Sequence, residues 1–157
     1  MIKVDRRSSV TQATPSEVFQ ALSDPNRIES LLPRMRKVEV VSRDTDSARL
    51  VTHMSMGGIF GTIRCEGDLH WVEPHEIVFK VKKPLPLEMR WHLSPSINGT
   101  DLKATLQLDL TPLLGPMAKF IPKESVIDII GKELESALKE LSLRLGHSVL
   151  HECAVGV

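Results

Sequence analysis

Residues 87–110 have the sequence LEMRWHLSPSINGTDLKATLQLDL, in which apolar and polar residues alternate on both sides of Asn98–Gly99. An Asn–Gly pair between two alternating runs is a strong signal for a β-hairpin with a two-residue loop. The facing residues that this loop predicts are Trp91 with Leu106, Met89 with Leu108, and Leu87 with Leu110. All three pairs are apolar, and a slip by one residue would turn the apolar face of one strand to solvent. The stretch therefore predicts a hairpin with one apolar and one polar face.

The same apolar face continues through the turns that precede this hairpin. A two-residue loop at Gly57–Gly58 predicts four facing pairs: Met56 with Ile59, Met54 with Gly61, Thr52 with Ile63, and Leu50 with Cys65. The turns at Pro74, at Pro84 and at 44–46 predict the pairs Trp71 with Ile77, Leu69 with Phe79, Phe79 with Met89, Val40 with Leu50, and Val38 with Thr52. Seven strands are thus expected, at 2–12, 35–43, 47–56, 59–73, 76–83, 87–97 and 100–111.

Two short helices are expected between the first and the second strand. Thr14-Pro15-Ser16-Glu17 combines a capping residue, a proline suited to the first helical position and the glutamate of a capping box. A second helix is expected to begin at Asp24–Pro25 and to end at Pro33, with Ile28, Leu31 and Leu32 on its apolar side. These helices interrupt the sheet and are expected to close one of its ends.

The last helix is the only long amphipathic element of the sequence. Its apolar residues recur at spacings of three and four from Val126 through Leu134 to Leu145. Gly146 is expected to end it, which predicts one domain over 1–146 and a loose tail over 147–157. Because an apolar sheet face needs a cover, the predicted fold is α+β, a curved seven-stranded antiparallel sheet around a long C-terminal helix.

The composition excludes several classes of function. Lys plus Arg and Asp plus Glu number 20 each, so the net charge is zero and provides no field that attracts nucleic acid or an anionic membrane. Four Phe, two Trp and no Tyr are few rings for stacking on bases. No apolar run approaches the roughly 18 residues of a membrane span, and the charged residues among 3–7 are unlike a signal peptide. With two cysteines and no disulfide framework, we expect a cytoplasmic protein.

The order of these elements, with several short motifs, resembles the START / Bet v 1-like (helix-grip, SRPBCC) superfamily over residues 2–146. The motifs are Ala13-Thr14-Pro15-Ser16-Glu17-Val18-Phe19, Leu22-Ser23-Asp24-Pro25, the Asn98-Gly99-Thr100 turn and the terminal helix. Within the superfamily the chain is most similar to two branches, the polyketide cyclase/dehydrase type and a type named after an accessory subunit of carbon-monoxide dehydrogenase. The resemblance implies a hydrophobic cavity between sheet and helix for a lipid, quinone, sterol or polyketide. Its members include carriers, chaperone-like factors and some enzymes, so the resemblance does not decide the activity.

Residues that face inward on the strands and on the last helix are the candidate ligand contacts. Methionines among them suit an adaptable apolar site, because the thioether is flexible. The same face also fits a filled core, and that alternative stays open at this point. The candidate ligand-binding residues are Thr52, Met54, Met56, Ile63, Cys65, Leu69, Trp71, Phe79, Met89, Trp91, Leu106, Leu108, Met117, Phe120, Val126, Ile130 and Leu134.

Three further features bear on the mouth of such a cavity. The segment 112–122, with Met117 and Phe120, is apolar without periodicity and is expected either to gate the mouth or to pack as a lid on the core. Arg6 has the inward parity of its strand and is a candidate contact for a ligand's head group, unless a bulge or the strand end turns it to solvent. Gly131, within the last helix, indicates close approach either of a ligand or of the sheet.

Reactive groups are few in this pattern. Cys65 is expected to behave as a small apolar residue rather than as a reactive thiol. His53, His70 and His92 alternate onto the polar face, which we expect to be solvated and therefore not catalytic.

No metal or cofactor is expected either. His147, His151 and Cys153 have a spacing that would suit a metal if the last helix continued past Gly146, but no fourth ligand is near in the sequence. No phosphate loop, nucleophile elbow or dinucleotide motif is present. We therefore expect no catalytic residues.

The sequence favours binding or transport of a hydrophobic small molecule that is lipid-, quinone- or polyketide-like. Two alternatives remain, a polyketide cyclase/aromatase-like enzyme that uses the same pocket and an accessory interaction subunit. The expected partner is an apolar small molecule, with no nucleic acid and no integral membrane association. A partner protein or a homodimer is left open.

Overall fold

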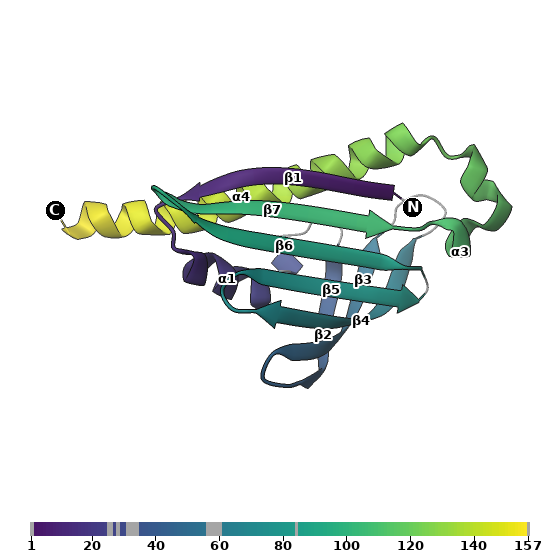
Figure 1. Cartoon of the computed structure of the whole chain (residues 1–157), viewed down its shortest axis with the longest axis horizontal. Coiled ribbons are helices and arrows are strands. Elements are labelled where there is room, and N and C mark those ends of the chain that lie inside the picture. The colour runs from purple at the N-terminus through teal and green to yellow at the C-terminus, as the bar shows by residue number, and fades with distance from the viewer. Residues whose placement is uncertain are drawn as a thin grey trace.

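The computed structural model describes residues 2–24, 27, 29–30, 35–55, 61–83 and 85–156, with the backbone alone for Leu113 and for 146–156. Seven antiparallel strands form one curved sheet in the order β1-β7-β6-β5-β4-β3-β2, and helix α4 runs along one of its faces (Figure 1). The strands are β1 (Ile2–Thr11), β2 (Met35–Arg43), β3 (Ser47–Ser55), β4 (Thr62–Val72), β5 (Glu76–Lys83), β6 (Leu87–Ser96) and β7 (Gly99–Leu108). The helices are α1 (Pro15–Ser23), α3 (Thr111–Leu114), the 3₁₀ helix η2 (Gly115–Phe120) and α4 (Lys123–Gly156). The predicted α+β helix-grip fold is confirmed.

The predicted register is confirmed at three of the turns. Trp71 faces Ile77 and Leu69 faces Phe79 across β4 and β5. The turn at Pro84 brings Phe79 opposite Met89, and β2 and β3 pair Val40 with Leu50 and Val38 with Thr52. In each case the apolar residues of neighbouring strands lie on the same face of the sheet.

The register predicted at the two glycine turns is wrong by two residues. Thr52 faces Cys65 and Met54 faces Ile63, so the connection between β3 and β4 is longer than the expected Gly57–Gly58 loop, whose residues lie outside the described ones. In β6 and β7, the observed pairs are Trp91 with Ala104, Met89 with Leu106, and Leu87 with Leu108. A shift by two residues leaves the faces unchanged, because side chains alternate with a period of two.

Gly99 explains the shift in the second hairpin. It lies in β7 opposite Ser96, so Ile97 and Asn98 occupy the loop. A Cβ on Gly99 would collide with the backbone oxygen of Val10, which lies on the neighbouring β1. The glycine is therefore required for close approach of β1 and not for the backbone conformation of the turn.

Helix α1 begins as the sequence predicts. The backbone N–H of Glu17 donates to Thr14 Oγ1 at 3.2 Å, and the Thr14 N–H donates to Glu17 Oε1 at 3.4 Å, which completes the capping box. The helix buries Val18, Phe19 and Leu22 and contacts β5, β6, β7 and α4. It thus fills one end of the space between the sheet and α4. The second short helix expected from Asp24 falls largely outside the described residues.

Helix α4 extends past its predicted end. It continues to Gly156, so the expectation that Gly146 ends it is wrong. A glycine costs a helix interior about 1 kcal/mol relative to alanine, and no proline follows Gly146 to stop the chain. The division into a domain at 1–146 and a tail at 147–157 stays a prediction. Among the described residues, no helix combines the length and the apolar character needed to cross a bilayer.

The core and the remaining space divide α4 between them. Leu134, Ala137, Leu138 and Leu141 are at most 3% exposed and belong to the apolar core with α1 and the sheet. Nearer its N-terminus, Val126 and Ile130 are only half-buried. The sheet is therefore fully covered towards α1 and incompletely covered towards the beginning of α4.

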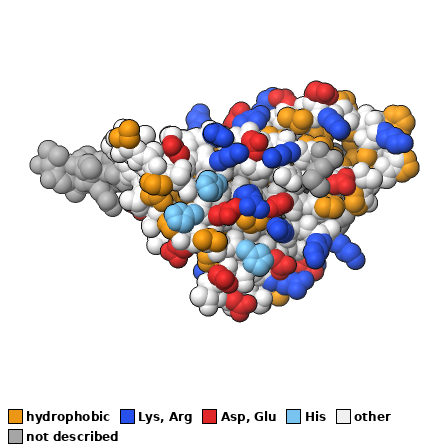
Figure 2. All heavy atoms as spheres, viewed as in Figure 1, with side chains coloured by type: hydrophobic (Ala, Val, Ile, Leu, Met, Phe, Trp, Pro, Cys, Tyr) orange, Lys and Arg blue, Asp and Glu red, His pale blue; other side chains and the backbone are white. Residues whose placement is uncertain are grey.

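The outer face of the sheet is polar, as predicted. Side chains of both charges and histidines are interspersed over it (Figure 2). Arg90 of β6 donates to Glu76 of β5 and, at 2.7 Å, to Glu88 of its own strand. Candidate catalysis by His53, His70 or His92 was not expected on this face, and His70 and His92 are exposed.

Candidate ligand-binding cavity

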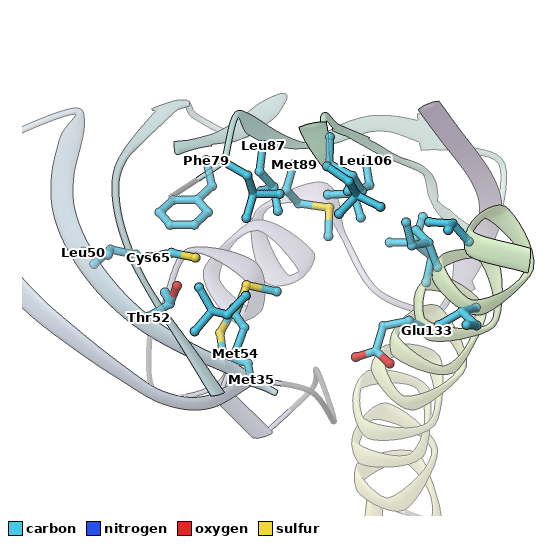
Figure 3. Close-up of a pocket in the computed structure, with 18 of the residues that line it drawn as sticks. Met35, Leu50, Thr52, Met54, Cys65, Phe79, Leu87, Met89, Leu106 and Glu133 are labelled. Carbon is cyan, nitrogen blue, oxygen red and sulfur yellow. The ribbon is translucent and has the colours of Figure 1, made fainter. Parts of the chain in front are cut away.

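A cavity of about 310 Å³ lies between the curved sheet and the first turns of α4 (Figure 3). This volume is at the lower end of the range of small-molecule pockets, which is about 300–1,000 Å³. The inward parity of β3 to β7 supplies one wall, and the apolar spacing of α4 supplies the other. Of the predicted contacts, the cavity wall contains Thr52, Met54, Ile63, Cys65, Leu69, Phe79, Met89, Trp91, Leu106, Leu108, Val126, Ile130 and Leu134.

The cavity has a buried and a more open end. At β3 and β4, Leu50, Thr52 and Cys65 are at most 3% exposed. At the opposite end, Ile129 of α4 is 50% exposed although it lines the cavity. A ligand would therefore reach solvent on the side of α4 and not through the β3–β4 wall.

Gly67 gives the Phe79 ring its place in the wall. A Cβ on Gly67 would stand 2.8 Å from Phe79 Cε2 and 2.6 Å from the backbone oxygen of Lys80. Both distances are below ordinary contact distances. The glycine of β4 thus allows the neighbouring ring of β5 to lie flat against the sheet beside the cavity.

Thr52 is the most constrained polar group of the wall. Its side chain is 1% exposed, and its Oγ1 has no hydrogen-bond partner among the described residues. A buried hydroxyl without a partner costs about 1–3 kcal/mol. The hydroxyl is therefore an unsatisfied donor and acceptor within an apolar wall.

Cys65 faces Thr52 across β3 and β4. Burial raises the pKa of the Cys65 thiol. The group is therefore a neutral thiol around neutral pH and a weak nucleophile. This agrees with the expectation of an apolar rather than a reactive cysteine.

Glu133 was missed by the sequence analysis. It is half-buried, and among the described residues that line the cavity it is the only charged one. Its carboxylate lies on α4, across the cavity from Thr52 and Cys65 (Figure 3). A signal was present, because Glu133 follows Ile130 by three positions and so belongs to the same helix face.

Four predicted contacts lie outside the described cavity wall or outside the described residues. The Trp71 ring faces the Arg43 guanidinium at 5.8 Å, at the polar edge of the sheet. Met117 and Phe120 are 60% and 84% exposed on η2. Met56 falls outside the described residues. Because 111–120 forms helical turns and not an extended lid, its neighbours Leu110, Leu114 and Ile121 line the cavity instead.

Arg6 does not line the cavity either. No bulge interrupts its strand, but its Nε donates to Glu135 Oε1 of α4 at 3.0 Å. The guanidinium occupies the space that a side chain at Gly131 would need. Gly131 thus serves close packing of β1 against α4. A contact of Arg6 with a ligand's head group stays a prediction.

The wall also contains residues that were not among the predicted contacts. Leu50 and Ile77 have the inward parity, and the others come from strand ends or from the approach to α4. They are Met35, Val38, Leu50, Ile77, Leu85, Leu87, Leu110, Leu114, Ile121, Ile129 and Glu133.

The part of the chain that the structure describes contains no group of His, Cys, Asp or Glu side chains arranged to hold a metal ion. The side chains of His147, His151 and Cys153, whose spacing was considered for a metal, lie outside the described residues.

A sheet wrapped around one helix with an apolar cavity between them is the architecture of a known family. Residues 1–145 match the family described as "Polyketide cyclase / dehydrase and lipid transport". The chain belongs to this family. The match agrees with the START / Bet v 1-like resemblance. Among curated proteins, none matches the chain.

Solved structures share the fold of this family member. TTHA0849 from Thermus thermophilus is 20% identical, with a TM-score of 0.75 over 94% of this chain and 97% of its own. A START superfamily protein from Mycobacterium smegmatis is 17% identical, with a TM-score of 0.71 over 92% and 97% of the two chains. The di-domain ARO/CYC StfQ from the steffimycin biosynthetic pathway is 17% identical, with a TM-score of 0.65 over 99% of this chain and 53% of its own. At these identities the likeness concerns the fold.

Proposed function

We propose that this protein binds a hydrophobic small molecule, lipid-, quinone- or polyketide-like, in the cavity between the sheet and α4. The observation that carries the proposal is the wall of this cavity. Apart from Thr52, Cys65 and Glu133, the described residues that form it have hydrocarbon, thioether or aromatic side chains. The family to which the chain belongs includes lipid transport in its description.

Burial of the ligand supplies the binding free energy. Each Å² of apolar surface removed from water contributes about 25 cal/mol, and part of this is lost to the entropy of immobilising the ligand. Met54 and Met89 lie in the wall and can adjust their rotamers to ligands of different outline. Entry is proposed past Leu110, Leu114 and Ile121, next to the more exposed residues of α4.

Extraction of the native protein tests this proposal. The protein is purified without detergent, extracted with organic solvent, and the extract is analysed by mass spectrometry. We expect a stoichiometric apolar molecule. Met89→Lys places an ammonium group in the wall and is expected to abolish its recovery, with folding checked by circular dichroism. Met117→Lys is the matched control, because Met117 is 60% exposed and lies outside the wall.

The proposal fails if no molecule is recovered and if no lipid, quinone or polyketide of a test panel raises the melting temperature of the wild type. Equal recovery from Met89→Lys and the wild type would also contradict it, because the cargo would then lie elsewhere.

A second candidate is a cyclase- or aromatase-like enzyme that uses the same cavity. Glu133 favours it, because a half-buried carboxylate beside an apolar ligand can act as a general base. The ARO/CYC neighbour StfQ carries the corresponding name. Conversion of a polyketide substrate by the wild type, lost in Glu133→Gln while binding persists, would establish this activity.

An accessory subunit with an incidental cavity is the third candidate, and co-purification of a stable partner enzyme with an empty cavity would favour it. For either function we propose a cytoplasmic setting, on the ground that the chain has two cysteines and no disulfide framework.

A further inference from the structure

We propose that the ligand of this cavity is uncharged and carries a hydroxyl or carbonyl oxygen that hydrogen-bonds to Thr52 at the buried end. This inference rests on the proposed function and narrows its ligand class. It starts from one atom, Thr52 Oγ1, which is buried in the cavity wall without a hydrogen-bond partner among the described residues.

The surroundings of Thr52 require a partner from the ligand. The neighbouring wall residues Leu50, Met54 and Cys65 offer at most the weak donor of a thiol (Figure 3). A valine in this place would have nearly the same shape without the buried polar atom. The threonine therefore has a cost in the empty protein that a ligand oxygen can remove.

The charge of the ligand follows from the rest of the wall. The described residues that line the cavity include no Lys, Arg or His, and the one charged residue is the acidic Glu133. A carboxylate or phosphate at the buried end would lose its hydration without gaining a cation, which costs several kcal/mol. A hydroxyl or carbonyl loses much less and regains a hydrogen bond at Thr52.

The orientation of the ligand also follows. Thr52 lies in the buried wall, whereas the more exposed lining residues, such as Ile129, are on the side of α4. The oxygen-bearing end of the ligand therefore enters first, and the apolar remainder fills the space between Phe79, Met89 and α4. The site selects for an oxygen at one end of an otherwise apolar molecule.

Three probes with one carbon skeleton test this inference: naphthalene, 2-naphthol and 2-naphthoate. Their dissociation constants are measured by calorimetry at neutral pH. For the wild type, 2-naphthol is expected to bind about twofold to tenfold more tightly than naphthalene, the range of one net hydrogen bond. 2-Naphthoate is expected to bind more weakly than both.

Variants at position 52 separate the hydrogen bond from the cavity. In Thr52→Val, the preference for 2-naphthol over naphthalene is expected to disappear while naphthalene binds at least as well. Thr52→Ser retains a hydroxyl and should keep the preference. Thr62→Val is the matched control, because Thr62 is exposed and lies outside the wall. Thr52→Ala also lacks the hydroxyl and provides a second variant should the valine form not fold.

The possible results are distinct. An unchanged preference in Thr52→Val overturns the inference and leaves the proposed function standing. Binding of 2-naphthoate as tight as that of 2-naphthol overturns the requirement for an uncharged ligand. If none of the three probes binds the wild type, the inference fails, whereas the proposed function is decided separately by the extraction experiment.

Discussion

The guanidinium of Arg6, on β1, lies over Gly131 of α4, in the space that a Cβ at that position would occupy. The same side chain pairs with Glu135 one turn further along the helix, at 3.0 Å. An edge strand and the covering helix are thereby joined through a residue that has no side chain. The glycine, which lowers helix stability by itself, is explained by this packing and not by the approach of a ligand.

The contact predicts that Arg6 and Gly131 are energetically coupled. In an Arg6→Ala background, Gly131→Ala is expected to stabilise the protein by about 1 kcal/mol, because only the helix propensity changes. In the wild type the gain should be smaller, since the new methyl group displaces Arg6 from Glu135, a partly exposed pair worth about 0.2–1 kcal/mol.

Urea unfolding of the four proteins in this double-mutant cycle measures the coupling. Identical effects of Gly131→Ala in both backgrounds would show that the guanidinium does not depend on the missing side chain.

Gly67 offers a second glycine with a different constraint. A methyl group there meets the backbone oxygen of Lys80 as well as the Phe79 ring, and the backbone cannot rotate away. Gly67→Ala is therefore expected to destabilise the protein by about 1–3 kcal/mol. Phe79→Leu in the same chain should recover part of this loss, because it relieves the contact with the ring and not the one with the backbone. A chemical denaturation curve that is unchanged by Gly67→Ala would contradict the close approach of β4 and β5.

The buried thiol makes stability depend on pH in the alkaline range. Burial raises the pKa of Cys65 above its ordinary value of 9.0, so the folded state holds this proton more firmly than the unfolded state. The contribution is fully present below about pH 9 and is lost as the pH rises through the pKa of the folded protein.

Between pH 8 and about pH 10.5, the free energy of unfolding is expected to fall more steeply for the wild type than for Cys65→Ala. The comparison concerns the slope with pH, since the alanine variant also loses packing at all pH values. Cys153→Ser is the control for the second thiol of the chain. Parallel curves for the wild type and Cys65→Ala would contradict the raised pKa.

The faces of the strands could be predicted from the sequence more reliably than their register. The alternation around Leu106 and Met89 determines which side chains face inward, and it is unaffected by the error of two residues in their pairing. The register itself depends on contacts with a distant strand, such as that of Gly99 with Val10, which no local pattern contains. Pro74 and Pro84 predicted their turns correctly because there the connection is determined locally.

The cavity was predictable to the extent that it follows strand parity. Thr52, Cys65 and Met89 were predicted from alternation alone, whereas Glu133 was overlooked because attention went to the apolar positions of its helix face. Met117 and Phe120 were assigned to the mouth on composition, but η2 turns them to solvent. In a segment without periodicity, side-chain direction depends on a helical turn that the sequence did not indicate.

The last prediction compares two buried threonines. Thr52 and Thr100 are both at most 1% exposed, but Thr100 Oγ1 donates to the backbone oxygen of Ala13 at 2.8 Å, whereas Thr52 Oγ1 has no partner among the described residues. The same substitution should therefore act in opposite directions. In the ligand-free protein, Thr52→Val is expected to raise the free energy of unfolding by about 1 kcal/mol, and Thr100→Val to lower it by about 1–3 kcal/mol, because it leaves the Ala13 carbonyl without its donor. Urea unfolding after solvent extraction of the protein measures both. A loss of stability in Thr52→Val would mean that its hydroxyl is satisfied in the empty protein. A gain would identify Thr52 as a residue that lowers the stability of the empty protein, as expected of a side chain whose partner is the ligand.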